Sequence, residues 1–373
     1  MKNFKIIISV ALIAFLILGG KPRNNLRDLS VVEGIGIDYE SGEYMATVQS
    51  LNLSKEGRGA EALSGNVTMN NTGKGKNIAA AVDDVSKSIS KKQFFGQSRV
   101  MIFGMKIAQS SLESSLDYFL RSIDSRSDVC VAVSSQKASE IIKSKENDAL
   151  VPAQTISSLL SLSEKNGFGA YVTTNDLLNA YADKTSDIYL PVLSIENEAV
   201  KVVGIAVYSE NKLVKILNSE ETFGFLFLTN KIDNGLLEFE DENLGEINAK
   251  IISSSTKVSA NYENGKVVYK VKIKTKIMLN QVENGALNFL TQNDLKNIQN
   301  LANKKIENLC MSAFNTCMAN KSDVLRIGDC LAMKSPKAYD FLSDDWHANL
   351  QNCRLQISVN CNLNKISENS ETN

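Results

Sequence analysis

His347 is the only histidine of the chain, and it ends the segment Asp344-Asp345-Trp346-His347. An imidazole beside a carboxylate can act as a general base for a serine nucleophile, so Asp345 and His347 are the candidates for a hydrolase site. Neighbours in sequence do not establish the geometry that catalysis needs, and the chain has no G-x-S-x-G motif. We therefore favour a partly exposed histidine beside a core tryptophan, and we predict a protein without catalytic residues.

The cysteines are the second group with possible chemistry. Cys130 lies alone upstream, and five others lie close to the C-terminus: Cys310, Cys317, Cys330, Cys353 and Cys361. Zinc sites pair cysteines as C-x-x-C or combine them with several histidines, and neither pattern occurs here. We predict no metal site and no other cofactor. Buried free thiols are the expected state, and a disulfide bridge among these cysteines is the alternative for an exported chain.

Two glycine-rich segments resemble phosphate-binding loops. The segment Gly34-Ile-Gly36-Ile-Asp38 lacks the third glycine of a dinucleotide fingerprint, and a hairpin rather than a helix is expected after it. We interpret these glycines as allowing close packing at a strand. Asn71-Thr-Gly-Lys-Gly-Lys76 precedes an expected helix, whose free N–H groups could hold an anion, but no Walker motif is present. A solvated turn is the preferred interpretation.

Composition limits the classes of partner. The chain has 373 residues, of which 43% are apolar, so it can bury sizeable cores in two or three domains. Its 41 basic and 42 acidic side chains give a net charge of −1. Because binding to a phosphate backbone needs clustered positive charge, we predict no nucleic-acid partner.

The N-terminus indicates the compartment. Lys2 and Lys5 precede the 13-residue segment 6–18, which is apolar except for Ser9, and Gly19 and Gly20 follow it. As a helix this run measures roughly 20 Å, short of a hydrocarbon core of roughly 30 Å, so residues 1–20 are typical of an export segment. An uncleaved membrane anchor is the alternative. The end of the segment is similar to a bacterial lipobox in which Gly20 stands where the lipid-bearing cysteine is expected, so this position has no thiol to acylate.

Hydrophobic periodicity predicts the elements that position these residues. Alternation predicts hairpins over 30–53 and 202–217 and long strands over 247–260 and 267–282. The polar segment 54–75 is expected to be loop with one strand around 66–69. Apolar residues at helical spacing predict helices, the longest of them over 293–318. A strand over 98–104 and another over 128–133, each followed by a helix, indicate an α/β layer.

We therefore expect an α+β, mixed α/β fold with mixed and antiparallel sheets flanked by helices. The expected units are the export segment 1–20, an N-terminal α/β domain 21–199, a small middle domain 200–255 and a C-terminal α+β domain 256–373.

The order of several short segments resembles the Ger(x)C family of spore germination proteins. Leu26-Arg-Asp-Leu-Ser-Val-Val-Glu-Gly-Ile-Gly-Ile-Asp38 is similar to the pattern that follows the lipidated cysteine of that family, and Phe95-Gly-Gln-Ser-Arg-Val-Met-Ile-Phe-Gly104 to its next block. Leu116-Asp117 through Asp128 matches a further block of the family. Glu221-Thr-x-Gly224 resembles its central region, and Ser322-Asp323 with Trp346 its C-terminal part. The likeness spans nearly the whole chain.

This resemblance implies a three-domain lipoprotein, the C subunit of a nutrient germinant receptor, on the outer face of the inner spore membrane. Its implied partners are a membrane-embedded A subunit and a permease-like B subunit. Lipidation would fall at position 20, where Gly20 replaces the family's cysteine. A non-catalytic scaffold or signalling role agrees with the lack of catalytic motifs. The alternative function is an extracytoplasmic ligand-binding module similar to a transporter's solute-binding protein, which would need a deep interdomain cleft.

Overall fold

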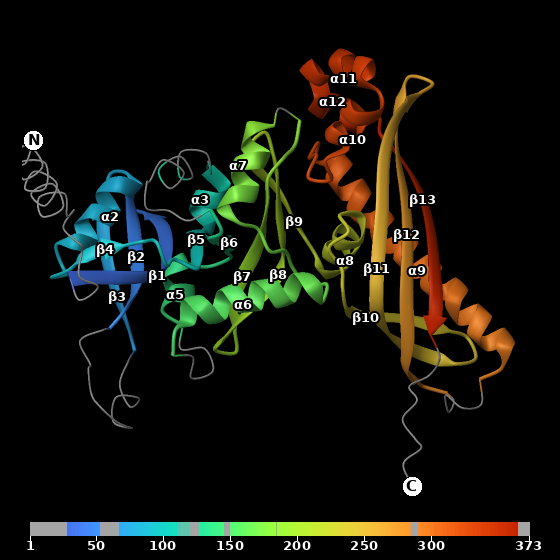
Figure 1. The fold of residues 1–373 in the computed structure, drawn as a ribbon, viewed down its shortest axis with the longest axis horizontal. Helices are drawn as coiled ribbons and strands as arrows, with labels where there is room; N and C mark the ends of the chain where they lie inside the picture. The colour runs from blue at the N-terminus through green and yellow to red at the C-terminus, as the bar shows by residue number, and fades with distance from the viewer. Residues whose placement is uncertain are drawn as a thin grey trace, which may run out of the picture.

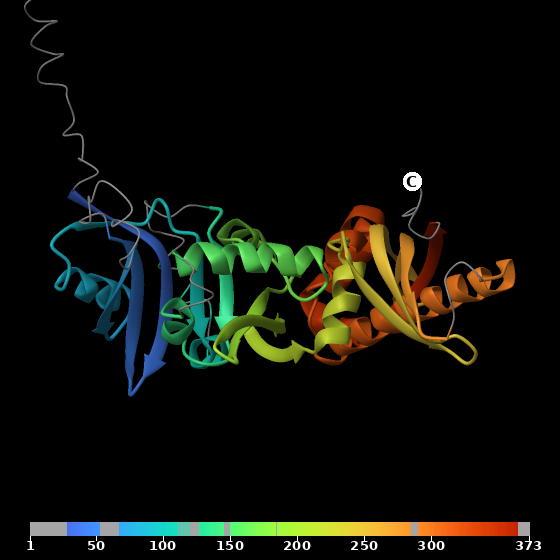
Figure 2. The same ribbon diagram turned by 90° about the horizontal axis from the view of Figure 1, so that it is seen from below.

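The computed structural model describes residues 28–52, 67–110, 112, 115, 118, 127–144, 150–183, 185–284 and 290–364. The export segment and Gly20 lie outside these residues, as do the family-like residues Leu116 and Asp117. Figures 1 and 2 show an elongated molecule with the N-terminal strands at one end and a C-terminal unit at the other.

A nine-stranded sheet forms the N-terminal part. Its order is β3-β2-β1-β5-β6-β7-β8-β9, and β4 also pairs with β1. Strands β1, β5, β6 and β7 are parallel, and antiparallel pairs extend this parallel centre on both sides. The strands are β1 (Leu29–Glu40), β2 (Glu43–Leu51), β3 (Thr68–Gly75), β4 (Lys92–Phe94), β5 (Val100–Gly104), β6 (Cys130–Ser134), β7 (Tyr189–Glu196), β8 (Ala199–Ser209) and β9 (Lys212–Leu217).

Helices cover this sheet because each carries an apolar stripe. Residues Ile78, Ala81, Val82 and Val85 of α2 are buried, as the helical spacing predicts. The helices of this part are α2 (Ile78–Ser86), α3 (Met105–Ser110), α5 (Ala138–Ile142), α6 (Pro152–Lys165) and α7 (Thr174–Ala182). The buried strands β5 and β6 with the helices after them confirm the predicted α/β layer.

A four-stranded sheet forms the C-terminal unit, in the order β10-β11-β12-β13. Strands β10, β11 and β12 are antiparallel, and β13 joins β12 in parallel. The long helix α9, predicted over 293–318, crosses one face of this sheet (Figure 1). The elements are α8 (Ser219–Leu228), β10 (Gly235–Asp241), β11 (Gly245–Glu263), β12 (Lys266–Val282), α9 (Gln292–Ala319), α10 (Ile327–Lys334), α11 (Pro336–Leu342), α12 (Trp346–Leu350) and β13 (Arg354–Asn364).

The short helix α8 joins the two parts. It follows β9 directly, and its side chains from Phe225 to Leu228 are buried in a core that both sheets share. Gly224 of α8 lies against the backbone of Leu309 in α9, where a Cβ atom would overlap the Leu309 carbonyl oxygen. The two sheets are therefore held together by packing around α8 and α9.

This architecture confirms the predicted mixed fold class. One element differs from the expectation: strand β3, paired with β2, runs from Thr68 to Gly75, whereas a strand was expected only around 66–69 and a loop after it. The proposed division at 199/200 falls in β8, and the division at 255/256 falls in β11. The three-domain division stays a prediction about folding units.

Candidate functional site

The buried carboxylate of Asp187 links the two parts of the molecule. It precedes β7 in the nine-stranded sheet, and its Oδ1 accepts a hydrogen bond of 2.9 Å from the backbone N–H of Glu210 in the β8–β9 turn. Its Oδ2 accepts a hydrogen bond of 2.7 Å from the N–H of Asp323 and lies 3.0 Å from Nε2 of His347 in α12. One side chain of the first sheet therefore fixes two segments of the C-terminal unit.

Asp323 is the second centre of this junction, and it is completely buried. Its Oδ1 accepts a 2.7 Å hydrogen bond from Ile327 N–H, and its Oδ2 accepts bonds of 2.8 Å from Gly328 N–H and 2.9 Å from Trp346 Nε1. The carboxylate thus satisfies the first N–H groups of α10 and anchors the core tryptophan of α12. Burial raises the pKa of Asp323 to about 7, although its three N–H donors lower it.

The cavity beside this junction has a volume of about 430 Å³ and a polar lining. Both sequence candidates, Asp345 and His347, line it, but the carboxylate that pairs with His347 is Asp187 and not Asp345. The two serines of the lining are engaged elsewhere: Ser186 Oγ donates to Asp183, and Ser343 Oγ donates to the Asp340 carbonyl. The geometry is that of an ion pair within a structural junction.

The His347–Asp187 pair predicts a pH dependence of stability. The hydrogen bond from Asp187 raises the pKa of His347 above its ordinary value of 6.5. A raised folded-state pKa adds stability that is complete below pH 6.5 and is lost as the pH rises through the folded-state pKa. We expect His347→Gln to cost about 1.5–3 kcal/mol at pH 6, the value of a hydrogen bond between charged groups, and less at pH 8.

Chemical denaturation at pH 6 and pH 8 measures this difference. Asp345→Asn is the matched control, because Asp345 is an exposed neighbour whose removal leaves the pair intact. A cost of His347→Gln that is equal at both pH values would contradict the ion pair.

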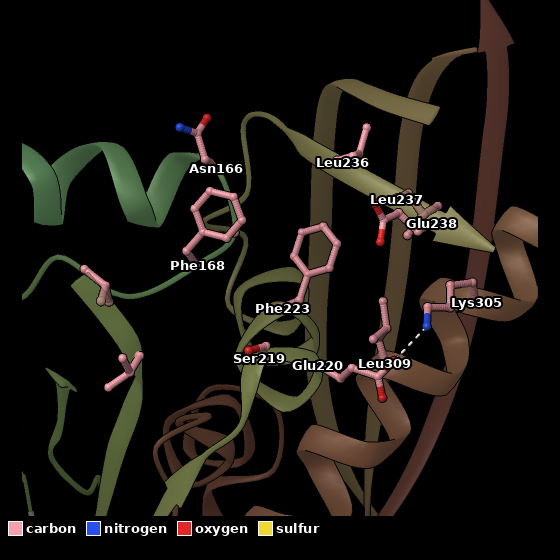
Figure 3. Close-up of a pocket in the computed structure, with 13 residues that line it drawn as sticks. Asn166, Phe168, Ser219, Glu220, Phe223, Leu236, Leu237, Glu238, Lys305 and Leu309 are labelled. Carbon is pink, nitrogen blue, oxygen red and sulfur yellow. Dashed lines mark hydrogen bonds and ion pairs between the residues drawn. The ribbon is translucent and has the colours of Figure 1, made fainter. Parts of the chain in front are cut away.

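A second cavity, of about 260 Å³, lies where the end of α6 faces α8 and β10 (Figure 3). Its walls are mainly apolar, and Phe168 is 62% exposed beside it. Lys305 Nζ and Glu220 Oε1 form a 2.8 Å ion pair at its α8–α9 side. The remaining apolar side chains of the lining are Val202, Val203, Phe223, Leu236, Leu237 and Leu309.

All six cysteines are free and buried, which confirms the expected state over the bridged alternative. Burial raises the pKa of the Cys353 and Cys361 thiols to about 12, so little reactive thiolate forms at neutral pH. Among the residues that the structure describes, no cluster of histidine, cysteine or carboxylate side chains has the arrangement of a metal site.

Thiol labelling tests the cysteine assignment. We expect the folded chain to react with a thiol reagent at least 100-fold more slowly than the chain in denaturant, because all six thiols must first be exposed. A reducing agent should leave the unfolding midpoint unchanged. A shift of that midpoint on reduction, with fewer than six thiols in the unreduced chain, would reveal a bridge.

The glycine motifs serve packing. A Cβ atom at Gly34 would lie 2.7 Å from Cβ of Ala153, and one at Gly36 would lie 3.0 Å from the Ala138 backbone, so the interpretation as packing glycines is confirmed. The interpretation of Asn71–Lys76 as a solvated turn is wrong, because Gly73 and Gly75 belong to β3 and allow α2 to lie against it.

Sequence reasoning missed Asp187 as a partner of His347. The two residues are 160 positions apart, and nothing in the segment Ser186-Asp187-Ile188 marks the aspartate as special. For Asp323 the only signal in the sequence is its place in Ser322-Asp323, which resembles the C-terminal part of the family.

The comparisons with known proteins identify the class to which this two-sheet architecture belongs. Residues 22–195 match the model of the spore germination protein N-terminal domain, and residues 203–367 match the model described as spore germination B3/GerAC-like, C-terminal. These matches define a spore germination protein by class. The chain belongs to the Ger(x)C family.

Relatives agree with this assignment along most of the chain. The chain is 24% identical to spore germination protein B3 of Bacillus subtilis (strain 168), over 86% of this chain and 87% of that protein. It is 22% identical to spore germination protein KC of the same organism, over 90% and 89% of the two chains. The crystal structure of the GerBC protein has a similar fold, with a TM-score of 0.60 and 19% identity, covering 88% of this chain and 96% of that one.

Within the described part of the chain, no helix is both long enough and apolar enough to cross a bilayer.

Proposed function

We propose that this chain is the non-catalytic C subunit of a nutrient germinant receptor. In this proposal it acts as a scaffold or signalling component and assembles with the membrane-embedded A and B subunits. The observation that carries the proposal is that both halves of the chain match spore germination domain models, in the order and over nearly the full length found in the relatives.

The polar junction supports a role without catalysis. The carboxylates of Asp187 and Asp323 accept hydrogen bonds from backbone N–H groups, Trp346 and His347, so their hydrogen-bonding capacity is used to hold segments together. A catalytic acid or base needs a free position facing a substrate. These groups instead set the relative positions of the two sheets, as a scaffold requires.

The sequence supports a location on the outer face of the inner spore membrane. The basic and apolar residues 2–18 are typical of an export signal, and the family-like segment begins soon after them. Gly20 has no thiol for a diacylglycerol group, so in this sequence the apolar segment itself would provide the attachment. Mass spectrometry of the membrane fraction tests this: intact residues 1–19 support the anchor, and a chain cleaved before residue 20 contradicts it.

Germination of a deletion strain tests the proposed function. Spores that lack the chain should lose the response to at least one single nutrient in a panel, and the wild-type gene should restore that response. A His347→Gln chain should also restore it, because the proposal gives the imidazole no catalytic role. A normal response of the deletion strain to every nutrient that the parent strain senses would overturn the proposal.

The second candidate function, a ligand-binding module, is favoured by the apolar cavity beside Phe168 and Phe223. A ligand that binds only the folded state must raise the unfolding temperature. Thermal-shift measurements with amino acids, sugars and nucleosides separate the two functions. The scaffold role predicts no shift at millimolar concentrations, whereas a dose-dependent rise that Phe223→Ala abolishes would favour ligand binding.

A further inference from the structure

The outer face of the four-stranded sheet, opposite α9, carries a long stripe of basic side chains. In β12 the residues alternate between a buried set that includes Tyr269 and Ile273 and an outward set that contains most of the lysines. We call the outward surface of β12, β13 and residues 253–263 of β11 the basic face. Its charged residues are Lys257, Lys266, Lys270, Lys272, Lys274, Lys276 and Arg354, with the single carboxylate Glu263.

The register of the sheet concentrates this charge. Lys272 of β12 lies directly opposite Lys257 of β11, so two like charges stand side by side, an arrangement that costs stability unless something outside the sheet compensates it. Glu263 neutralises Lys270 at 2.6 Å, which leaves the lysines at 272, 274 and 276 without a carboxylate on the face. The stripe from Lys266 to Lys276 is about 33 Å long at the usual rise of a strand.

The composition of the basic face indicates what covers it. Besides the charged residues, the outward positions of this part of β11 and of β13 are Ser253, Ser255, Ser259, Asn261, Gln356, Ser358, Asn360, Asn362 and Asn364, and those of β12 include Val268 and Met278. Protein interfaces are depleted in lysine and serine, and their hot spots are mainly tryptophan, tyrosine and arginine. The face has one arginine at its edge and no aromatic ring among these residues. A diffuse anionic surface suits such a face, because it attracts flexible lysines without requiring shape complementarity.

We propose that the basic face lies against the anionic headgroups of a membrane. This inference rests on the membrane location in the proposed function, and it adds a surface and a lipid class that the family assignment does not supply. Each lysine near an anionic surface increases binding about fivefold, so the lysines of this stripe would together orient the C-terminal unit on the bilayer.

Lysine footprinting on the full-length chain tests this proposal. The chain is reconstituted into vesicles of phosphatidylcholine alone, or of equal parts phosphatidylcholine and phosphatidylglycerol, and treated with a lysine-acylating reagent. We expect labelling of Lys272, Lys274 and Lys276 to fall about fivefold or more in the anionic vesicles, and to recover in high salt. The exposed Lys212 and Lys215 of β9 are the internal controls and should label equally in both vesicles.

The variant Lys272→Glu/Lys274→Glu makes the result specific. It changes exposed side chains and places a glutamate opposite Lys257, so the unfolding temperature should not fall while the anionic protection of Lys276 is lost. Equal labelling of the wild-type lysines in both vesicles would overturn the proposal. A third arm adds solubilised proteins of the native membrane to the phosphatidylcholine vesicles. Protection in that arm alone would assign the face to an acidic protein and would also overturn it. None of these results depends on whether the chain co-purifies with receptor subunits.

Discussion

Replacing Gly224 with leucine should lower the free energy of unfolding by more than about 3 kcal/mol, because overpacking at this helix crossing has no room to relax. A Cβ atom at this position would overlap the carbonyl oxygen and carbon of Leu309, and these are backbone atoms that cannot rotate away. Helix α8 would have to move off α9, which would open the core that both sheets share. The carbonyl of Gly224 also accepts a hydrogen bond from the Cys310 thiol, and this contact would be lost.

Chemical denaturation of purified wild-type and Gly224→Leu chains measures this loss. Gly265→Asn is the matched control: this turn glycine has nothing within 4 Å of a Cβ atom, and asparagine tolerates its φ of +78°. The control should change stability by less than about 0.5 kcal/mol. A Gly224→Leu chain as stable as the control would show that α8 and α9 do not cross at the distance described.

Asp323→Ala should also be strongly destabilising, at a cost of about 3–5 kcal/mol. It would leave Ile327 N–H, Gly328 N–H and Trp346 Nε1 buried without their acceptor. Each unsatisfied donor costs about 1–3 kcal/mol, and the loosening of Trp346 would also displace His347 from Asp187.

The pH profile of unfolding distinguishes this effect from a simple cavity. Because the pKa of Asp323 is raised to about 7, the folded state binds more protons than the unfolded state between roughly pH 4 and pH 7. This carboxyl group therefore makes stability fall as the pH rises through that window, and Asp323→Ala should flatten the fall. The exposed Asp344→Ala is the control and should have little effect at any pH. An unchanged pH profile of Asp323→Ala would contradict the role given to this carboxyl group.

Local patterns predicted most of the secondary structure. The apolar segment at 98–104 is the buried strand β5, and the stripe from Leu295 to Phe314 lies on α9 as expected. Most of strand β3 was not predicted, because its sequence TMNNTGKG is polar and rich in glycine, which normally marks a loop. This strand lies at the edge of the sheet, and its glycines are required by the close approach of α2. Tertiary packing overrode propensity there.

Local sequence patterns could not predict the polar junction around Asp187 and Asp323. The sequence singled out His347 and placed it beside Trp346 in the core, and both features are present. The sequence could not identify the carboxylate that pairs with His347. Asp344 and Asp345 are its neighbours in sequence, whereas Asp187 comes close to it only when the two sheets pack together. The same holds for the basic face: alternation predicted the strand over 267–282, but the position of Lys257 and Arg354 beside its lysines depends on strand register.

Purification of an affinity-tagged chain from crosslinked native spore membranes tests the central claim most directly, which is that the chain works by binding other receptor subunits. Mass spectrometry of the purified material should identify an A-type and a B-type germinant receptor subunit in amounts similar to the chain, with crosslinks to its described surface. Recovery of the chain without those subunits, or a purified chain that turns over a metabolite, would contradict the account.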